Sequence, residues 1–124
     1  MIRTDPRHAL GSVAESAVCE NLRTRGFDVI ERNWRRPWGE LDIIATHRGV
    51  IHFIEVKASA GERTGFEASR RADTAKMRKV LRTARSWLAE RSMSPETAWQ
   101  LDIVEVSIHG PSGHMRHFLN VSVP

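Results

Sequence analysis

The chain has 124 residues, of which 40% are hydrophobic and 27% charged, with a formal net charge of +4 and a pI near 10.2. This length and balance predict a single globular domain over residues 1–124 with one hydrophobic core. No apolar run approaches the roughly 18 residues of a membrane helix, the first residues lack a signal-peptide pattern, and a single cysteine, Cys19, excludes a disulfide framework within one chain. We therefore expect a cytoplasmic protein that has no membrane partner.

Residues 1–10 are expected to form a loose leader before the first helix. The stretch 12–15 (SVAE) matches a capping box, so it predicts a helix that begins there and ends near Arg25. Glu15 then has two possible roles. It is either the acid of the capping box or a third acidic group that reaches a metal site from this helix, in which case Gly11 would permit close approach.

Three strands are predicted after the first helix. A short strand is expected over 27–32, a turn over 35–39, and a hairpin of two strands over 40–45 and 50–57. Both hairpin strands are apolar on both faces apart from three carboxylates and one lysine. That pattern is typical of central strands that are covered on both sides.

The register of this hairpin decides where its charged residues lie. If Arg48 and Gly49 form a two-residue turn, Asp42 lies opposite Glu55. In the same register, residue 40 lies opposite residue 57, which are Glu40 and Lys57. A four-residue connection slides the register by two and keeps all four side chains on one face, whereas a slip by one would separate them.

Two facing carboxylates in an apolar sheet repel each other, and burying them unpaired costs several kcal/mol per ion. Lys57 offsets part of this cost, and a divalent cation such as Mg²⁺ could offset the rest. A lysine beside such a cation can help to deprotonate water or stabilise the charge that develops during phosphodiester hydrolysis. The alternative is a structural Glu–Lys salt bridge at the end of the sheet, with Asp42 capping a turn.

The second half of the chain predicts a helix followed by two strands. We expect a polar loop over 58–65, a long helix over 67–90, a strand over 100–108, a turn over 109–113 and an edge strand over 115–123. The predicted fold is α/β, with a mixed sheet flanked by helices in the order α-β-β-β-α-β-β. The expected core face of the long helix consists of Met77, Val80, Leu81, Ala84, Trp87 and Leu88.

Positive charge is concentrated on the predicted long helix. Residues 62–91 contain nine Lys or Arg and four acids, which gives a net charge of +5. One stripe opposite the apolar face is either a phosphate-binding surface or an ordinary solvated face. Lys76 borders the apolar face and is the better candidate for a basic group near the carboxylates. The stripe consists of Arg71, Arg78, Arg82 and Arg85.

A second basic segment precedes the acidic strand and alternates with tryptophans. Arginine on phosphate and tryptophan on a base face would suit nucleic acid. Tryptophans in such a position also serve as core or hairpin packing, so both interpretations stay open. The segment contains Arg32, Trp34, Arg35, Arg36 and Trp38.

The ordered set of motifs resembles the PD-(D/E)XK nuclease superfamily. More closely, it resembles the bacterial YraN family of uncharacterised proteins, which are considered distant relatives of archaeal Holliday junction resolvases. The resemblance covers about residues 8–122. Its pieces are Gly11-x-x-x-Glu15, 32–35 (RNWR), 39–45 (GELDIIA), 53–57 (FIEVK), Lys76, 101–104 (LDIV) and the ending 117–121.

The resemblance implies a restriction-endonuclease-like fold and a Mg²⁺- or Mn²⁺-dependent endonuclease. Its substrate would be nucleic acid, DNA rather than RNA, with branched and single-stranded structures as candidates, and a homodimer is suggested by analogy with the resolvases. The implied metal ligands are Asp42, Glu55 and the Val56 carbonyl. Lys57 is the implied catalytic lysine, and the implied catalytic set also includes Glu15 as a supporting acid and Glu40 as a motif residue.

The candidate nucleic-acid contacts are basic residues of the two segments described above, namely Lys76, Arg78, Arg82, Arg85, Arg35 and Arg36. Two positions depart from the family pattern. Ser59 stands where an arginine is usual, and Gln100-Leu101 precedes Asp102 where Arg-Phe is usual. The alternatives are a non-catalytic nucleic-acid-binding protein that retains the nuclease fold and a protein-interaction module.

Overall fold

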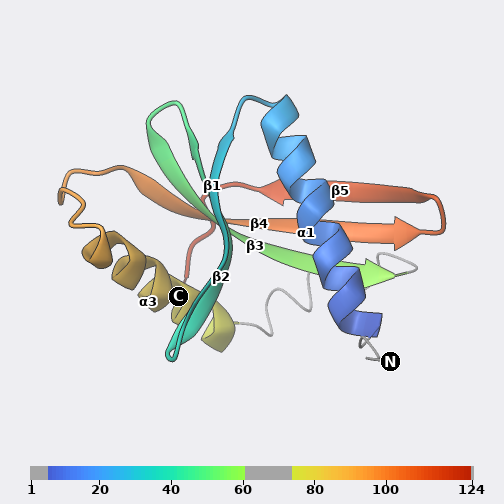
Figure 1. Cartoon of the computed structure of the whole chain (residues 1–124), viewed down its shortest axis with the longest axis horizontal. Coiled ribbons are helices and arrows are strands. Elements are labelled where there is room, and N and C mark those ends of the chain that lie inside the picture. Colours follow the sequence, from blue (N-terminus) through green and yellow to red (C-terminus); the bar gives the residue numbers. More distant parts are fainter. Residues whose placement is uncertain (1–5, 61–73, 124) are drawn as a thin grey trace.

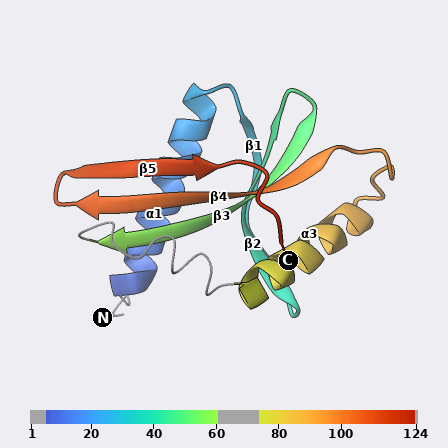
Figure 2. The same cartoon turned by 180° about the vertical axis from the view of Figure 1, so that it is seen from behind.

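One mixed five-stranded sheet with a helix on each face forms the fold (Figures 1 and 2). The computed structural model describes residues 6–60 and 74–123. The predicted order α-β-β-β-α-β-β is confirmed. The elements are α1 (Pro6–Thr24), β1 (Asp28–Arg36), β2 (Gly39–His47), β3 (Val50–Ala60), α3 (Thr74–Glu90), β4 (Trp99–His109) and β5 (Ser112–Phe118).

Helix α1 begins earlier than predicted. Residues 6–10 are helical, so the predicted leader is wrong for them. Ser12 and Glu15 consequently lie in the interior of the helix, where a capping box has no function. Pro6 at the first helical position fits this earlier start, because proline lacks only an N–H that would be unbonded there. A Cβ on Gly11 would have nothing within 4 Å, so the expected close approach at this glycine is also wrong.

The end of α1 agrees with prediction. Gly26 takes the left-handed conformation, with φ of 88°. The Phe27 N–H donates to the Leu22 carbonyl at 2.9 Å, and the Gly26 N–H donates to the Arg23 carbonyl at 3.1 Å. This pair of bonds is the Schellman motif, which satisfies the last helical carbonyls and turns the chain into β1.

The hairpin between β2 and β3 has the predicted two-residue turn. His47 pairs with Val50, and both Arg48 and Gly49 have positive φ, at 50° and 79°. These angles define the type I′ turn that matches the twist of a hairpin. The β1–β2 ladder contains an irregularity near the start of β1, between Val29 and Glu31, and ends at the turn formed by residues 37–38.

Strands β3 and β4 pair in parallel, whereas the other neighbouring strands are antiparallel. Alternate side chains of the sheet therefore belong to two cores, as the pleat requires. Phe53 and Ile44 pack with α3, and Ile54 and Ile43 pack with α1. Both faces are covered, which explains why β2 and β3 are apolar on both sides.

The buried face of α3 largely follows the helical pattern. Four of the predicted core residues are buried, and Leu81 and Leu88 are partly buried against the same core. Thr83 is also buried and was not predicted. Residues 58–60 of the loop predicted over 58–65 belong to β3, so the prediction is wrong for them. Residues 61–73, which include the rest of that loop and the predicted start of this helix, lie outside the described residues. The four buried residues are Met77, Val80, Ala84 and Trp87.

The final strand is shorter than predicted. β5 ends at Phe118, and Asn120 takes a left-handed φ of 53°. The Val121 N–H then donates to the Leu101 carbonyl at 2.8 Å, so the end of the chain crosses back over β4. The prediction of a strand through Val123 is therefore wrong for residues 119–123.

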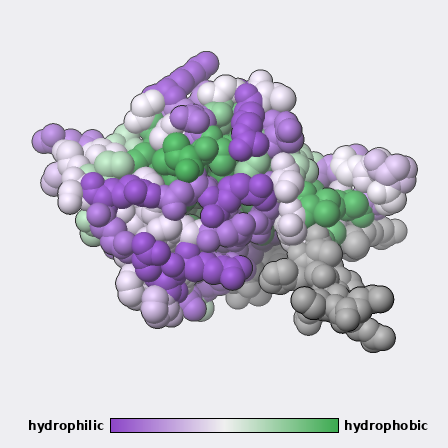
Figure 3. Space-filling view, viewed as in Figure 1, coloured by the Kyte–Doolittle hydropathy of each residue, from purple (hydrophilic) through white to green (hydrophobic). Residues whose placement is uncertain are grey.

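No helix in the described parts of the chain is both long and apolar enough to cross a bilayer. The face shown in Figure 3 is mainly hydrophilic and carries only small hydrophobic patches. Among the larger apolar side chains, Val13, Trp38 and Leu119 are more than half exposed, at 59%, 51% and 56%.

Candidate metal and nucleic-acid site

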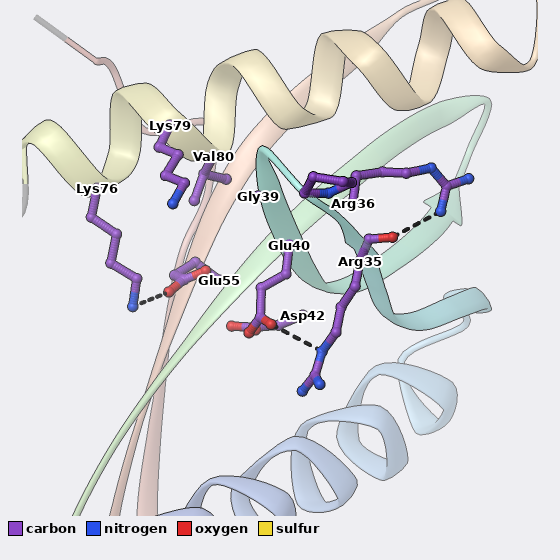
Figure 4. Close-up of a pocket in the computed structure, with 10 residues that line it drawn as sticks. Arg35, Arg36, Gly39, Glu40, Asp42, Glu55, Lys76, Lys79 and Val80 are labelled. Carbon is purple, nitrogen blue, oxygen red and sulfur yellow. Dashed lines mark hydrogen bonds and ion pairs between the residues drawn. The ribbon is translucent and has the colours of Figure 1, made fainter.

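A pocket of about 520 Å³ opens between the β1–β2 hairpin, β3 and the first turns of α3. Figure 4 shows acidic side chains on the sheet side and lysines that extend toward them from α3. The pocket therefore brings together the acidic strands and the basic helix of the sequence. Its lining residues are Arg35, Arg36, Pro37, Gly39, Glu40, Asp42, Glu55, Lys76, Lys79 and Val80.

Asp42 and Glu55 meet where the β2–β3 ladder ends. The last paired residues are Ile43 and Ile54, and Asp42 and Glu55 follow them by one position in the predicted register. Both are buried, with 8% and 4% of their surface exposed. Asp42 Oδ2 accepts a hydrogen bond from the Val56 backbone N–H at 2.9 Å. A carboxylate thus continues the ladder in place of the β2 backbone.

The environment of Asp42 favours its protonated form. Burial is the largest cause, and the charge of Glu55, a hydrogen bond between the two side chains and the charge of Glu15 act in the same direction. The hydrogen bond from Val56 opposes them. Together they raise the pKa of Asp42 from 3.8 to about 8. Without a cation, a proton on Asp42 therefore removes the charge repulsion between the Asp42 and Glu55 carboxylates.

The donor atoms of this pair suit a hard divalent cation. Carboxylate and carbonyl oxygens are the ligands that Mg²⁺ and Mn²⁺ prefer. The N–H and C=O of a strand residue point to the same edge, so the Val56 carbonyl faces the side of Asp42, where the β2 backbone no longer pairs. Within residues 6–60 and 74–123, no group of three or more His, Cys, Asp or Glu side chains is arranged to hold a metal. The oxygen ligands that this site provides for a cation are therefore two carboxylates and one backbone carbonyl.

The pocket lysines come from one side of α3. Lys76 Nζ lies 2.8 Å from Glu55 Oε1, and its side chain is 57% exposed. Lys79 follows three residues later and also lines the pocket (Figure 4). Sequence reasoning missed Lys79, although its spacing from Lys76 places the two on neighbouring positions of the helix surface.

Glu40 does not pair with Lys57. The β2–β3 ladder ends before that pair would form, and Glu40 instead forms an ion pair with Arg35 across the β1–β2 ladder, at 3.1 Å. Both of these side chains are more than half exposed. Lys57 lies two residues beyond Glu55 on the same face of the sheet and is half-buried. In the parallel backbone register of β3 and β4, it lies opposite Glu105. It is not among the described residues that line the pocket.

Glu15 approaches the acidic pair from α1. Burial raises its pKa, whereas a hydrogen bond with the Asn33 side chain and the charge of Arg32 lower it. Glu40 and Glu55 also contribute to the raised pKa, so Glu15 lies within electrostatic reach of the pocket. Of its two possible roles, that of capping acid is excluded by its position inside α1.

The predicted nucleic-acid contacts fall into two groups. Arg78, Arg82 and Arg85 are exposed on the outer side of α3 and do not line the pocket. Arg36 lines the pocket, but its guanidinium forms two hydrogen bonds with Glu90, at 2.9 and 2.7 Å. Arg35 and Lys76 are the remaining predicted contacts, and both line the pocket. Arg71 of the predicted stripe lies outside the described residues.

A second buried polar cluster was not predicted. The Asp102 carboxylate is fully buried and bonds to His52 Nδ1 at 2.7 Å and to His117 Nε2 at 2.8 Å. Gln100 and the Asn120 N–H also donate to it. Burial alone would raise the pKa of Asp102, but these bonds outweigh it and lower the pKa to about 2. The cluster ties the end of the chain to the sheet.

The fold and the pocket define a single-domain α/β protein with a buried carboxylate pair beneath basic side chains. The chain belongs to the uncharacterised protein family UPF0102, whose model matches residues 14–106. This confirms the resemblance to the YraN family. The matched range includes Glu15, Asp42, Glu55, Lys57 and Lys76.

Several relatives share most of their length with this chain. A UPF0102 protein of Campylobacter concisus is 39% identical over 100 residues, which cover 80% of this chain and 84% of the relative. A UPF0102 protein of Syntrophotalea carbinolica is 35% identical over 115 residues, which cover 93% and 92%. A UPF0102 protein of Helicobacter pylori is 42% identical over 83 residues, which cover 67% and 69%.

Proposed function

We propose that this chain is a Mg²⁺- or Mn²⁺-dependent nuclease that hydrolyses phosphodiester bonds in DNA. The observation that carries the proposal is the buried Asp42–Glu55 pair in a pocket with lysines on its other wall. Two adjacent buried carboxylates destabilise a fold unless they hold a proton or a cation. Their position beside basic groups favours a site that takes a cation together with an anionic substrate.

The position of each residue around the carboxylate pair indicates its role in the proposed reaction. Asp42, Glu55 and the Val56 carbonyl would hold the cation. A bound divalent cation would polarise a phosphate oxygen and offset the charge of the carboxylates. Lys57 would stabilise the negative charge that develops on the phosphate, and Glu15 and Glu40 would add negative charge near the cation. Lys76, Lys79 and Arg35 would bind the flanking phosphates.

The test is cleavage of labelled DNA by the purified protein with Mg²⁺ or Mn²⁺. A four-way junction, a single strand and a blunt duplex are compared for the wild type, Asp42→Asn and Lys57→Ala. Asp28→Asn is the matched control, because Asp28 is an exposed carboxylate outside the pocket. We expect cleavage by the wild type and the control only. Cleavage of equal rate in Asp42→Asn, or none in the wild type on any substrate, would refute the proposal.

One observation favours a second candidate, a nucleic-acid-binding protein that retains this fold without cleavage. Lys76 Nζ already lies 2.8 Å from Glu55 and supplies positive charge where a cation would bind. This candidate predicts DNA binding that weakens with salt, that survives Lys57→Ala and that falls in Lys76→Gln and Lys79→Gln. Binding that ignores the two pocket lysines would exclude it.

A further inference from the structure

Trp38 is exposed at the rim of the pocket. It lies at the β1–β2 turn between Pro37 and Gly39, and both of these neighbours line the pocket. Half of its surface, 51%, is exposed, whereas Trp34 and Trp87 are buried in the core. Trp38 belongs to neither hydrophobic core cluster, so its exposed ring is available for a role at the surface.

The ring is held in place by α3. Trp38 Nε1–H donates to Ser86 Oγ at 2.9 Å, and the Ser86 hydroxyl donates in turn to the Thr83 carbonyl at 3.1 Å. The turn lies so close to the helix at Gly39 that an added Cβ would come within 2.1 Å of Thr83 Oγ1. The indole is therefore fixed before any ligand arrives, which reduces the entropy that binding would cost.

Basic side chains line the pocket beside the turn that carries Trp38. Arg35, whose side chain is 63% exposed, and Lys79 line the pocket beside the turn. An aromatic platform next to cationic side chains is the combination that binds single strands, with phosphates on the charges and a base on the ring. Bases in a duplex are stacked on one another, so a fixed ring at the surface accepts a base only where that base is unpaired.

We propose that Trp38 is a stacking platform for an unpaired base, and that the pocket takes single-stranded DNA or a DNA strand with unpaired nucleotides beside the phosphate. The inference rests on the proposed function in that the pocket accepts a phosphodiester. It adds a residue that selects the substrate. The partner is identified by its chemistry, namely a flexible polyanion with a free aromatic face.

The experiment measures DNA binding in the presence of a chelator, so that it does not depend on cleavage. Fluorescence anisotropy gives the Kd for a thymine single strand of about 15 nucleotides and for a blunt duplex of about the same length. Trp38→Ala is expected to weaken binding of the single strand about tenfold and of the duplex less than about twofold. Trp38→Phe keeps a ring and should retain most of the affinity.

Met93→Ala is the control, because Met93 is an exposed apolar side chain outside this pocket, at 38%. It should change neither Kd, and thermal melting checks that each variant is folded. Equal losses on single strand and duplex, no loss in Trp38→Ala, or no binding of the single strand by the wild type would each overturn the inference. Tryptophan-dependent binding of the single strand without any cleavage would refute the proposed nuclease and leave this inference standing. Cleavage whose rate is unchanged in Trp38→Ala would overturn this inference and leave the proposed nuclease standing.

Discussion

The Val56 backbone N–H donates a hydrogen bond to Asp42 Oδ2 at 2.9 Å, at the point where the backbones of β2 and β3 stop pairing. The bond fixes Oδ2 of Asp42, and the Asp42 side chain also shares a hydrogen bond with Glu55. The bond from Val56 also keeps Asp42 beside Glu55, because Val56 is the next residue along β3. The acidic pair is thus a consequence of how the ladder ends.

The first prediction concerns Asp42 and pH. Its pKa is raised from 3.8 in the ordinary case to about 8 in the folded chain, so the folded state binds this proton more tightly than the unfolded state. The resulting stability is fully present below about pH 4 and is lost as the pH rises toward 8. Asp42→Asn removes this loss and can still accept the bond from Val56. We expect it to raise the free energy of unfolding at pH 8 by on the order of 2 kcal/mol without metal.

Denaturant unfolding at pH 5 and pH 8, in a chelator, measures this difference. The gain should be smaller at pH 5, where the carboxyl already holds its proton. Asp28→Asn, an exposed carboxylate, is the control and should show little change at either pH. A gain that is equal at both pH values would contradict the assignment of the shift to Asp42.

The second prediction concerns competition between Lys76 and a cation. The Lys76 ammonium lies 2.8 Å from Glu55, so removing its charge leaves the carboxylate pair more attractive to Mn²⁺. Because Lys76 is 57% exposed, the effect is screened by solvent. We expect Lys76→Gln to tighten Mn²⁺ binding roughly threefold. Titration calorimetry measures it, with Arg78→Gln on the outer side of α3 as the control. Weaker Mn²⁺ binding in Lys76→Gln would mean that the lysine supports the cation site.

The third prediction contrasts two glycines. A Cβ on Gly39 would come within 2.1 Å of Thr83 Oγ1 and would push the β1–β2 turn away from α3. Gly11 lies inside α1, where an added Cβ has nothing within 4 Å. We expect Gly39→Ala to destabilise the fold by about 1–3 kcal/mol and Gly11→Ala to stabilise it by about 0.5–1 kcal/mol. Thermal unfolding of the two variants measures both changes. An unchanged stability of Gly39→Ala would show that the Thr83 side chain rotates away from the added Cβ.

The fourth prediction concerns Asp102. Asp102→Ala removes the acceptor shared by His52, His117 and the Asn120 N–H. These donors then lose their hydrogen-bond acceptor inside the protein. We expect a loss of about 3 kcal/mol or more at neutral pH. Urea unfolding of the variant against the wild type measures the loss. A loss within error would show that water replaces the carboxylate at no cost.

The wild type should also lose part of this stability in acid. The pKa of Asp102 is lowered from 3.8 to about 2, so its contribution is present above pH 4 and disappears as the pH falls through 2. The size of this contribution is about 2 kcal/mol. Unfolding measured from pH 5 down to pH 2 should show a decline in the wild type that is reduced in Asp102→Asn.

The strand register could be predicted from the sequence because side chains alternate and the type I′ turn has a fixed length. Arg48-Gly49 sets His47 opposite Val50, and the position of Asp42 relative to Glu55 follows by counting. The same counting fails for the next pair on this face, Glu40 and Lys57. It assumes that the ladder continues, whereas Glu40 joins Arg35 on the neighbouring strand. Whether two paired strands separate depends on the twist and on the helix packed above them.

Other features depend on contacts that are distant in the sequence. The partners of Asp102 lie at positions 52, 100, 117 and 120, and no local pattern links them. Lys79 and Thr83 face the β1–β2 turn because that turn docks on one side of α3, which a helical wheel does not reveal. The start of α1 was missed because the capping-box pattern also occurs inside helices.

The parallel pairing of β3 with β4 has a kinetic consequence. The strands over 28–60 are joined by short turns, as are those over 99–118, so each unit can form from local contacts. The two units meet along β3 and β4, and this contact requires the chain to close across the 61–98 segment of the sequence. We therefore expect this central contact to form late in folding. Helix α3 lies within that segment and packs on β2, and the described residues that line the pocket include none from β4 or β5. A chain stalled before β4 joins therefore has all the elements that form its acidic pair and its pocket.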